Sequence, residues 1–239
     1  MKNKHLEHLE DDILNNGSEG GKTSIAFLRS LGSMLSQGDK KKDMKVTTKW
    51  DGAPAIICGI DPITEYFFVG NKSVFNIDHP KVCVSSTGID QHYPESGLNS
   101  ILKSCLKNLS KLDIKGVIQG DLLYTEKTKT ITNVGGKRCV TFTPNTITYA
   151  IPLDTDLGKR VNNSNLGIVF HTSYTGSSLL EMSAGFGVDV SSYQGHKEVT
   201  VFSSCLAKMR LAIKYFLSFN IPSTITPFSS RNKLGTVPL

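Results

Sequence analysis

The sequence predicts an α+β domain in which antiparallel sheets are flanked by helices. Strand-like runs outnumber helical ones, and they lie at residues 45–49, 54–60, 66–70, 115–124, 139–142, 146–151 and 167–170. At least one helical segment, 98–111, lies between strands. A tight Asp51-Gly52 turn is expected between the first two strands, because glycine adopts positive φ without steric cost.

Apolar residues at helical spacing predict three helices, over 23–37, 98–111 and 203–219. Gly38 is placed to end the first, and Ser96 to cap the second. The polar residues 1–22 are expected to form an N-terminal arm, and 23–239 the folded domain. Residues 76–96 are expected to form a loop, and 127–137 a polar hairpin tip around Gly135-Gly136, while 153–165 form a polar segment.

The composition is that of an ordinary globular protein, with 38% hydrophobic and 20% charged residues in 239. The formal net charge of +6 favours polyanionic partners such as nucleotides or nucleic acid. Five cysteines without a C-x-x-C pair indicate neither a disulfide framework nor a zinc site. No apolar leader and no run of about 18 apolar residues is present, so we expect a cytoplasmic protein without a membrane partner.

The sharpest chemical signal is Lys49-Trp50-Asp51-Gly52, which lies between strand-like runs. The expected turn would hold the Lys49 amine at the lip of a sheet. A lysine there can act as a nucleophile if its surroundings lower its pKa. The alternative is a purely structural hairpin turn that carries a surface lysine.

Lys-x-Asp-Gly between two strands resembles the nucleotidyl-acceptor motif of the covalent nucleotidyltransferases, which include ATP-dependent DNA ligases, RNA ligases and mRNA capping enzymes. The resemblance covers roughly residues 45–175. It implies a ligase-type nucleotidyltransferase domain with an ATP-grasp-like fold. It also implies that Lys49 forms a covalent bond to AMP, with ATP and Mg²⁺ as cofactors.

Further residues can be matched to motifs of that family. Lys72 lies where the family has a ribose-contacting basic residue, and Asp121, in Gln119-Gly120-Asp121, lies where it has an acid. By the resemblance Asp121 binds the ribose or the metal, while Asp51 and Gly52 contribute to the nucleotide site. For the aromatic residue that stacks on the purine the candidates are Phe170 and Tyr149, of which Phe170 is preferred.

Two motifs of the family are missing. No acid opens the strand at 166–170, and Arg231-Asn232-Lys233 is a poor substitute for the terminal Lys-x-Lys. The chain is therefore expected to lack the end of the catalytic domain, or to be a divergent member. His171, which follows the 167–170 strand, is expected to be a hydrogen-bonded polar strand end.

The resemblance implies the joining of nucleic-acid ends, and the compact motif spacing favours RNA over DNA. Asp51 could cap the turn, orient Lys49 or lie near the metal, and GTP could replace ATP. The alternative is a non-catalytic nucleic-acid-binding protein with a degenerate nucleotidyltransferase fold.

Overall fold

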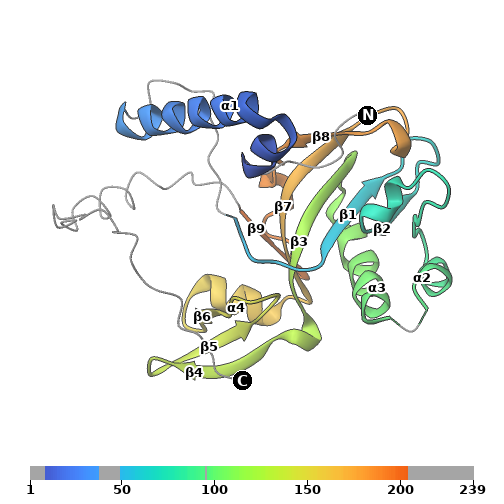
Figure 1. The fold of residues 1–239 in the computed structure, drawn as a ribbon. Coiled ribbons are helices and arrows are strands. Elements are labelled where there is room, and N and C mark those ends of the chain that lie inside the picture. The colour runs from blue at the N-terminus through green and yellow to red at the C-terminus, as the bar shows by residue number, and fades with distance from the viewer. Residues whose placement is uncertain (1–8, 38–48, 95, 204–239) are drawn as a thin grey trace, which may run out of the picture. The chain divides into compact units, whose positions relative to one another are not determined.

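The computed structural model describes residues 9–37, 49–94 and 96–203, which belong to one compact unit. The fold is α+β, as predicted (Figure 1). Its helices are α1 (Leu9–Gln37), α2 (Ser86–His92), α3 (Gly97–Leu109) and α4 (Asp156–Asn163). Its strands are β1 (Ala55–Ile60), β2 (Phe67–Gly70), β3 (Val117–Thr125), β4 (Thr130–Val134), β5 (Lys137–Phe142), β6 (Tyr149–Pro152), β7 (Leu166–Thr175), β8 (Ser183–Phe186) and β9 (Val199–Phe202).

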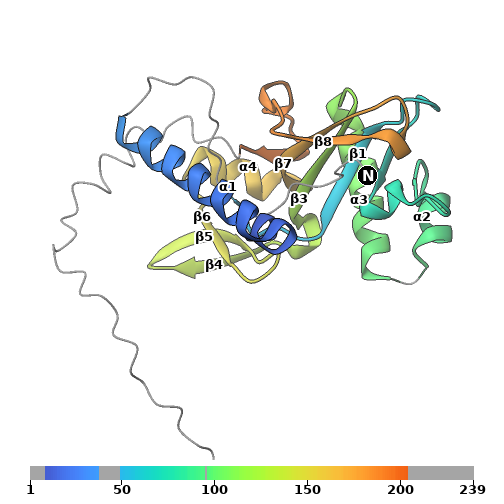
Figure 2. The same cartoon turned by 45° about the horizontal axis from the view of Figure 1, so that its top comes forward.

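The strands form two sheets. The larger has the order β2-β1-β3-β7-β8, and β9 also pairs with β7. All these pairings are antiparallel except β7 with β9. The smaller sheet has the order β4-β5-β6, and Figure 2 shows it apart from β1, β3 and β7.

The core of the larger sheet lies on both of its faces, which explains why β1 and β3 read as nearly continuous apolar runs. Ile118 and Leu122 of β3 pack in a cluster with Leu102 and Leu109 of α3. Val117 enters a different cluster. A third cluster contains residues of both sheets and of α4: Leu123, Tyr124, Val140, Phe142, Val161, Val169 and Phe202.

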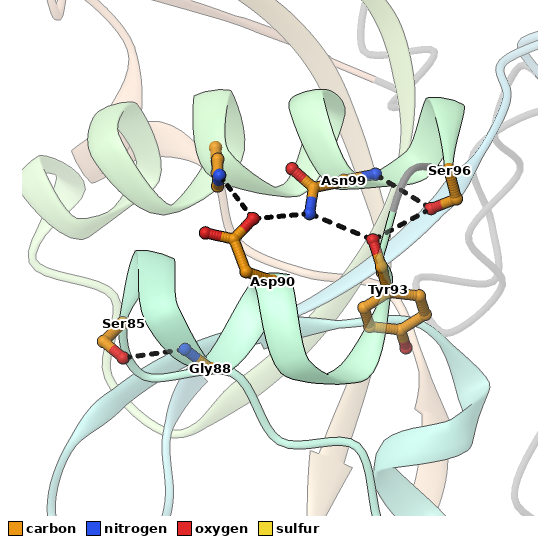
Figure 3. A network of polar contacts seen from close by, with 7 residues as sticks. Ser85, Gly88, Asp90, Tyr93, Ser96 and Asn99 are labelled. Carbon is orange, nitrogen blue, oxygen red and sulfur yellow. Dashed lines mark hydrogen bonds and ion pairs between the residues drawn. The ribbon is translucent and has the colours of Figure 1, made fainter.

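A polar network joins α2 to the start of α3 (Figure 3). Ser96 caps α3, as predicted, by accepting a hydrogen bond of 3.3 Å from the backbone N–H of Asn99. The Asn99 side chain donates to Asp90 at 2.9 Å and to the Tyr93 carbonyl at 3.0 Å. Asp90 also pairs with Lys103 at 2.6 Å. The network therefore fixes how α3 begins.

Several expectations were wrong in detail. The helix expected from residue 23 begins at Leu9, inside the expected arm, and bends at Gly17, where φ is 56°. Helix α2 lies in the segment expected to be a loop, and α4 in the polar segment 153–165, for which no helix was predicted. Each is capped by a hydroxyl, of Ser85 and Thr155 respectively. The hairpin tip is a full β4–β5 hairpin closed by Gly135-Gly136, whose φ angles are 57° and 80°.

Other expectations lie outside the described residues, namely the strand over 45–48, the cap at Gly38, the helix from 204 onward and the segment around Arg231. None of the described helices is long and apolar enough to span a bilayer.

Candidate functional site

The Lys49 segment is not the tight turn that the sequence predicts. Residues 49–53 run as irregular chain into β1, and Gly52 does not have a positive φ. A glycine is required here because β3 lies so close. A Cβ at Gly52 would lie 2.6 Å from the Asp121 Cβ and 3.0 Å from the Leu122 carbonyl oxygen. Hydrogen bonds from the Ala53 N–H to Leu122 (2.9 Å) and from Leu122 to Pro54 (3.1 Å) hold this segment against β3.

Asp121, in the middle of β3, therefore lies next to the Lys49 segment, so two of the expected motifs meet beside the start of β1. The Nε2 atom of His171 lies 3.4 Å from the Asp121 carboxylate, and both side chains are about one quarter exposed. The His171 Nδ1 shares a hydrogen bond of 2.8 Å with the hydroxyl of Thr172. Asp121 and His171 thus form a polar pair with access to solvent.

His171 reaches Asp121 because β7 contains an irregularity. Thr172 pairs with Gln119 and Phe170 pairs with Gly120, so His171 is an extra residue between them. We expected His171 at the polar end of a strand, whereas it lies inside β7.

Magnesium is the metal that the resemblance implies. Among the described residues no group of three or more His, Cys, Asp or Glu side chains lies close enough to hold a metal. Mg²⁺ often takes only one or two carboxylates and fills its other positions with water and substrate phosphates. A single carboxylate at Asp121 fits that pattern.

Asp51 points its carboxylate at the β5–β6 connection. It accepts hydrogen bonds from the Asn145 side chain, from the N–H and hydroxyl of Thr146, and from the N–H of Ile147, all at 2.8–2.9 Å. These bonds, with the Thr146 side chain contributing most, lower the pKa of Asp51 from 3.8 to about 2. The backbone N–H of Asp51 donates to the Tyr149 hydroxyl at 2.8 Å.

Trp50 and Lys49 differ in their surroundings. The Trp50 ring lies 5.2 Å from Tyr149 and 5.0 Å from Phe202, between centroids. Lys49 is exposed, and no hydrogen bond or ion pair joins it to another described residue. The backbone beside Lys49 is thus held firmly, while the lysine side chain is exposed and has no polar partner within the described part of the chain.

The remaining predicted residues, Lys72 and Phe170, lie in different parts of the larger sheet. Lys72 is exposed and follows β2, which ends at the same end of the sheet where β1 begins. Phe170 is fully buried and packs in the cluster that Ile118 and Leu122 enter. Because adjacent strand residues face opposite sides, Asp121 lies on the other face of the sheet from Leu122. The structure thus does not bring Phe170 together with Lys49 and Asp121.

Comparison with known proteins places the chain in a family. No curated protein and no solved structure matches it. A match to the family of unknown function DUF6267 extends over residues 3–230, nearly the whole sequence. The chain therefore belongs to the DUF6267 family.

Proposed function

We propose that the protein is a covalent nucleotidyltransferase of the polynucleotide-ligase type, which acts through Lys49. The observation that carries this proposal is the contact between Gly52 and Asp121. It joins the lysine segment to an acid on the neighbouring strand beside the start of β1, and β2, which Lys72 follows, ends opposite Ile57 of β1. An accessible lysine on a fixed backbone is what attack on a nucleotide phosphate requires.

In the proposed reaction, the Lys49 ammonium loses a proton to water and its Nζ attacks the α-phosphorus of ATP. The new N–P bond forms as the bond between the α-phosphorus and the bridging oxygen breaks, and pyrophosphate leaves. Asp121 binds the ribose hydroxyls or carries Mg²⁺, whose role is to neutralise phosphate charge. Lys72 supplies a further positive charge to the nucleotide.

The AMP group then passes from Lys49 to a 5′-phosphate of nucleic acid, which frees the amine. A 3′-hydroxyl attacks that phosphate, the strands are joined, and AMP is released. We propose RNA as the preferred nucleic-acid substrate, with DNA as the alternative substrate.

The test is covalent labelling of the full chain. The protein is incubated with α-³²P-ATP and Mg²⁺, denatured and examined for label that acid removes. We expect label on the wild type and on Lys115→Ala, which replaces an exposed lysine that pairs with Asp113 at 2.6 Å, but not on Lys49→Ala. Absence of label while a control ligase reacts, or label that persists in Lys49→Ala, would falsify the proposal.

A second candidate is a non-catalytic nucleic-acid-binding protein. It is favoured by the exposure of Lys49 without a partner among the described residues, and by the commitment of the Asp51 carboxylate to the 145–147 segment. This candidate predicts single-strand binding that weakens steeply with salt while no ATP-derived label forms. Filter binding at several salt concentrations, run beside the labelling assay, separates the two candidates.

A further inference from the structure

The smaller sheet holds the lysine segment by contacts that no part of the Lys-x-Asp-Gly pattern indicates. We infer that Tyr149 and the β5–β6 connection, residues 143–148, are positioning residues for Lys49, and we call this set the clamp. The inference rests on the proposed function, because it concerns the reactivity of that lysine. The clamp itself consists of contacts that can be tested without ATP.

The first part of the clamp is the Asp51 carboxylate. Both of its oxygens are occupied, Oδ1 by Asn145 and Oδ2 by three donors from Thr146 and Ile147. The connection that supplies these donors is itself closed by a bond of 2.8 Å between the hydroxyls of Thr143 and Thr148. A carboxylate in such a position fixes its own backbone, two residues from Lys49, to the smaller sheet.

The second part acts on the backbone and the ring. Tyr149 accepts the Asp51 N–H through its hydroxyl, and its ring contacts Trp50. On the other side, Gly52 is packed against Asp121 of the larger sheet. Tyr149 thus contacts both Trp50 and Asp51, and Asp121 contacts Gly52, so each of the three residues after Lys49 is held by the protein.

Such fixation bears on reaction rate more than on affinity. The nucleophile must be held within a narrow range of positions relative to the α-phosphorus, and misplacement by about 1 Å can reduce a rate about 100-fold. A structural role alone would make the clamp variants less stable but would leave the labelling rate of the folded protein unchanged.

The test compares two tyrosines from one aromatic cluster. Tyr149→Phe removes the hydroxyl that binds Asp51, whereas the control Tyr124→Phe removes one that binds Ser164 at 2.8 Å. We expect Tyr149→Phe to lower the labelling rate at saturating ATP by about tenfold or more, and to change the half-saturating ATP concentration less than about twofold. Tyr124→Phe should leave both values near those of the wild type.

Thr146 provides a second pair of variants, because it is exposed and its replacement does not disturb a core. Thr146→Ala removes one donor to Asp51 and should slow labelling, whereas Thr146→Ser keeps the hydroxyl and should restore the rate. Equal rates for the alanine and serine variants, or equal losses in Tyr149→Phe and Tyr124→Phe, would overturn the inference.

A readout without ATP separates failure of the clamp from failure of the proposed function. Trp50 is the only tryptophan, so its fluorescence reports on the lysine segment alone. We expect acrylamide to quench Trp50 more efficiently in Tyr149→Phe and Thr146→Ala than in the wild type and the two controls. Unchanged quenching refutes the clamp whether or not label forms, while increased quenching with no label in any variant refutes only the proposed reaction.

Discussion

Gly52 is the residue at which the Lys49 segment and β3 come closest. A methyl group there would meet Asp121 and Leu122 at 2.6 and 3.0 Å, distances at which backbone must shift. We therefore expect Gly52→Ala to lower the free energy of unfolding by about 1–3 kcal/mol, measured by urea denaturation.

Gly32 is the matched control for this substitution. It lies in α1 and is exposed, and in the described part of the chain an added methyl group there would have no neighbour within 4 Å. Alanine is favoured over glycine in a helix by about 1 kcal/mol, so Gly32→Ala should stabilise the protein slightly. If Gly52→Ala and Gly32→Ala changed the free energy of unfolding by the same amount and in the same direction, the contact of Gly52 with β3 would not be tight.

The Asp51 carboxylate gives the protein a pH-dependent contribution to stability. Its pKa falls from 3.8 to about 2 on folding, so the folded state favours the ionised form. The contribution is therefore complete above the unfolded value of 3.8, and it is lost as the pH falls toward 2.

The variant Asp51→Asn tests this contribution. We expect the melting temperature of the wild type to exceed that of Asp51→Asn at pH 5, and the gap to narrow as the pH is lowered from 4 toward 2. Asp90→Asn is the control away from the site, since Asp90 also accepts side-chain hydrogen bonds, from Asn99 and Lys103. A difference in melting temperature between the wild type and Asp51→Asn that stays constant from pH 4 to pH 2 would contradict a stabilising role of the ionised Asp51 carboxylate.

At the residue scale, the sequence indicated candidate side chains, but it did not indicate which residues would surround them. Asp121 was placed beside the lysine segment only by resemblance, and its partner His171 depends on a bulge in β7. The donors to Asp51 lie 94–96 residues further along the chain. Contacts over such separations depend on which strands pair, and local residue patterns do not determine that pairing.

Among the helices, α3 is the one whose limits the sequence determines best. The Ser96 hydroxyl caps it, and the Ser100 hydroxyl, one turn later, only returns a bond to the Gly97 carbonyl at 3.2 Å. We expect Ser96→Ala to lower the free energy of unfolding by about 1 kcal/mol, because a backbone N–H loses its acceptor.

Ser100→Ala is the matched control within the same helix. It removes a hydroxyl from an exposed position, and its effect should stay within about 0.5 kcal/mol. If thermal or urea unfolding shows the two alanine variants to be equally stable, the capping bond contributes nothing to the stability of α3.

The long helix α3, with its clear apolar period, and the long apolar strand β3 were predicted nearly in full. Several short elements were missed, although the four-residue strand β2 was predicted. Helix α2 has seven residues and buries only Ile89, while β8 and β9 have four residues each. Segments of this length show too few repeats of an apolar pattern to indicate a period, and neighbouring elements stabilise them.

In the whole compact unit, the aromatic cluster that both sheets share couples the stability of one sheet to that of the other. Tyr124 and Phe202 of the larger sheet contact Phe142 of the smaller sheet, with the closest centroids 4.8 Å apart. Two sheets that share a core should unfold together. We expect Trp50 fluorescence and far-ultraviolet circular dichroism to give the same urea midpoint.

Phe142→Ala tests this coupling. Removal of a buried phenylalanine should lower the free energy of unfolding by about 3–5 kcal/mol and shift both signals together. Ile131→Ala, in the exposed strand β4, is the control, because Ile131 is 51% exposed. Separate midpoints for the two signals would show that the sheets unfold independently.

Strand β9 has a consequence for synthesis of the chain on the ribosome. β7 is paired by β8 along its second half and by β9 along its first half, and Phe202 of β9 touches Trp50. Until residues 199–202 have been synthesised, the first half of β7 has an unpaired edge and Trp50 lacks one of its aromatic neighbours. The nascent domain therefore passes through a stage that is prone to mispairing, which ends only when Val199–Phe202 has emerged from the exit tunnel.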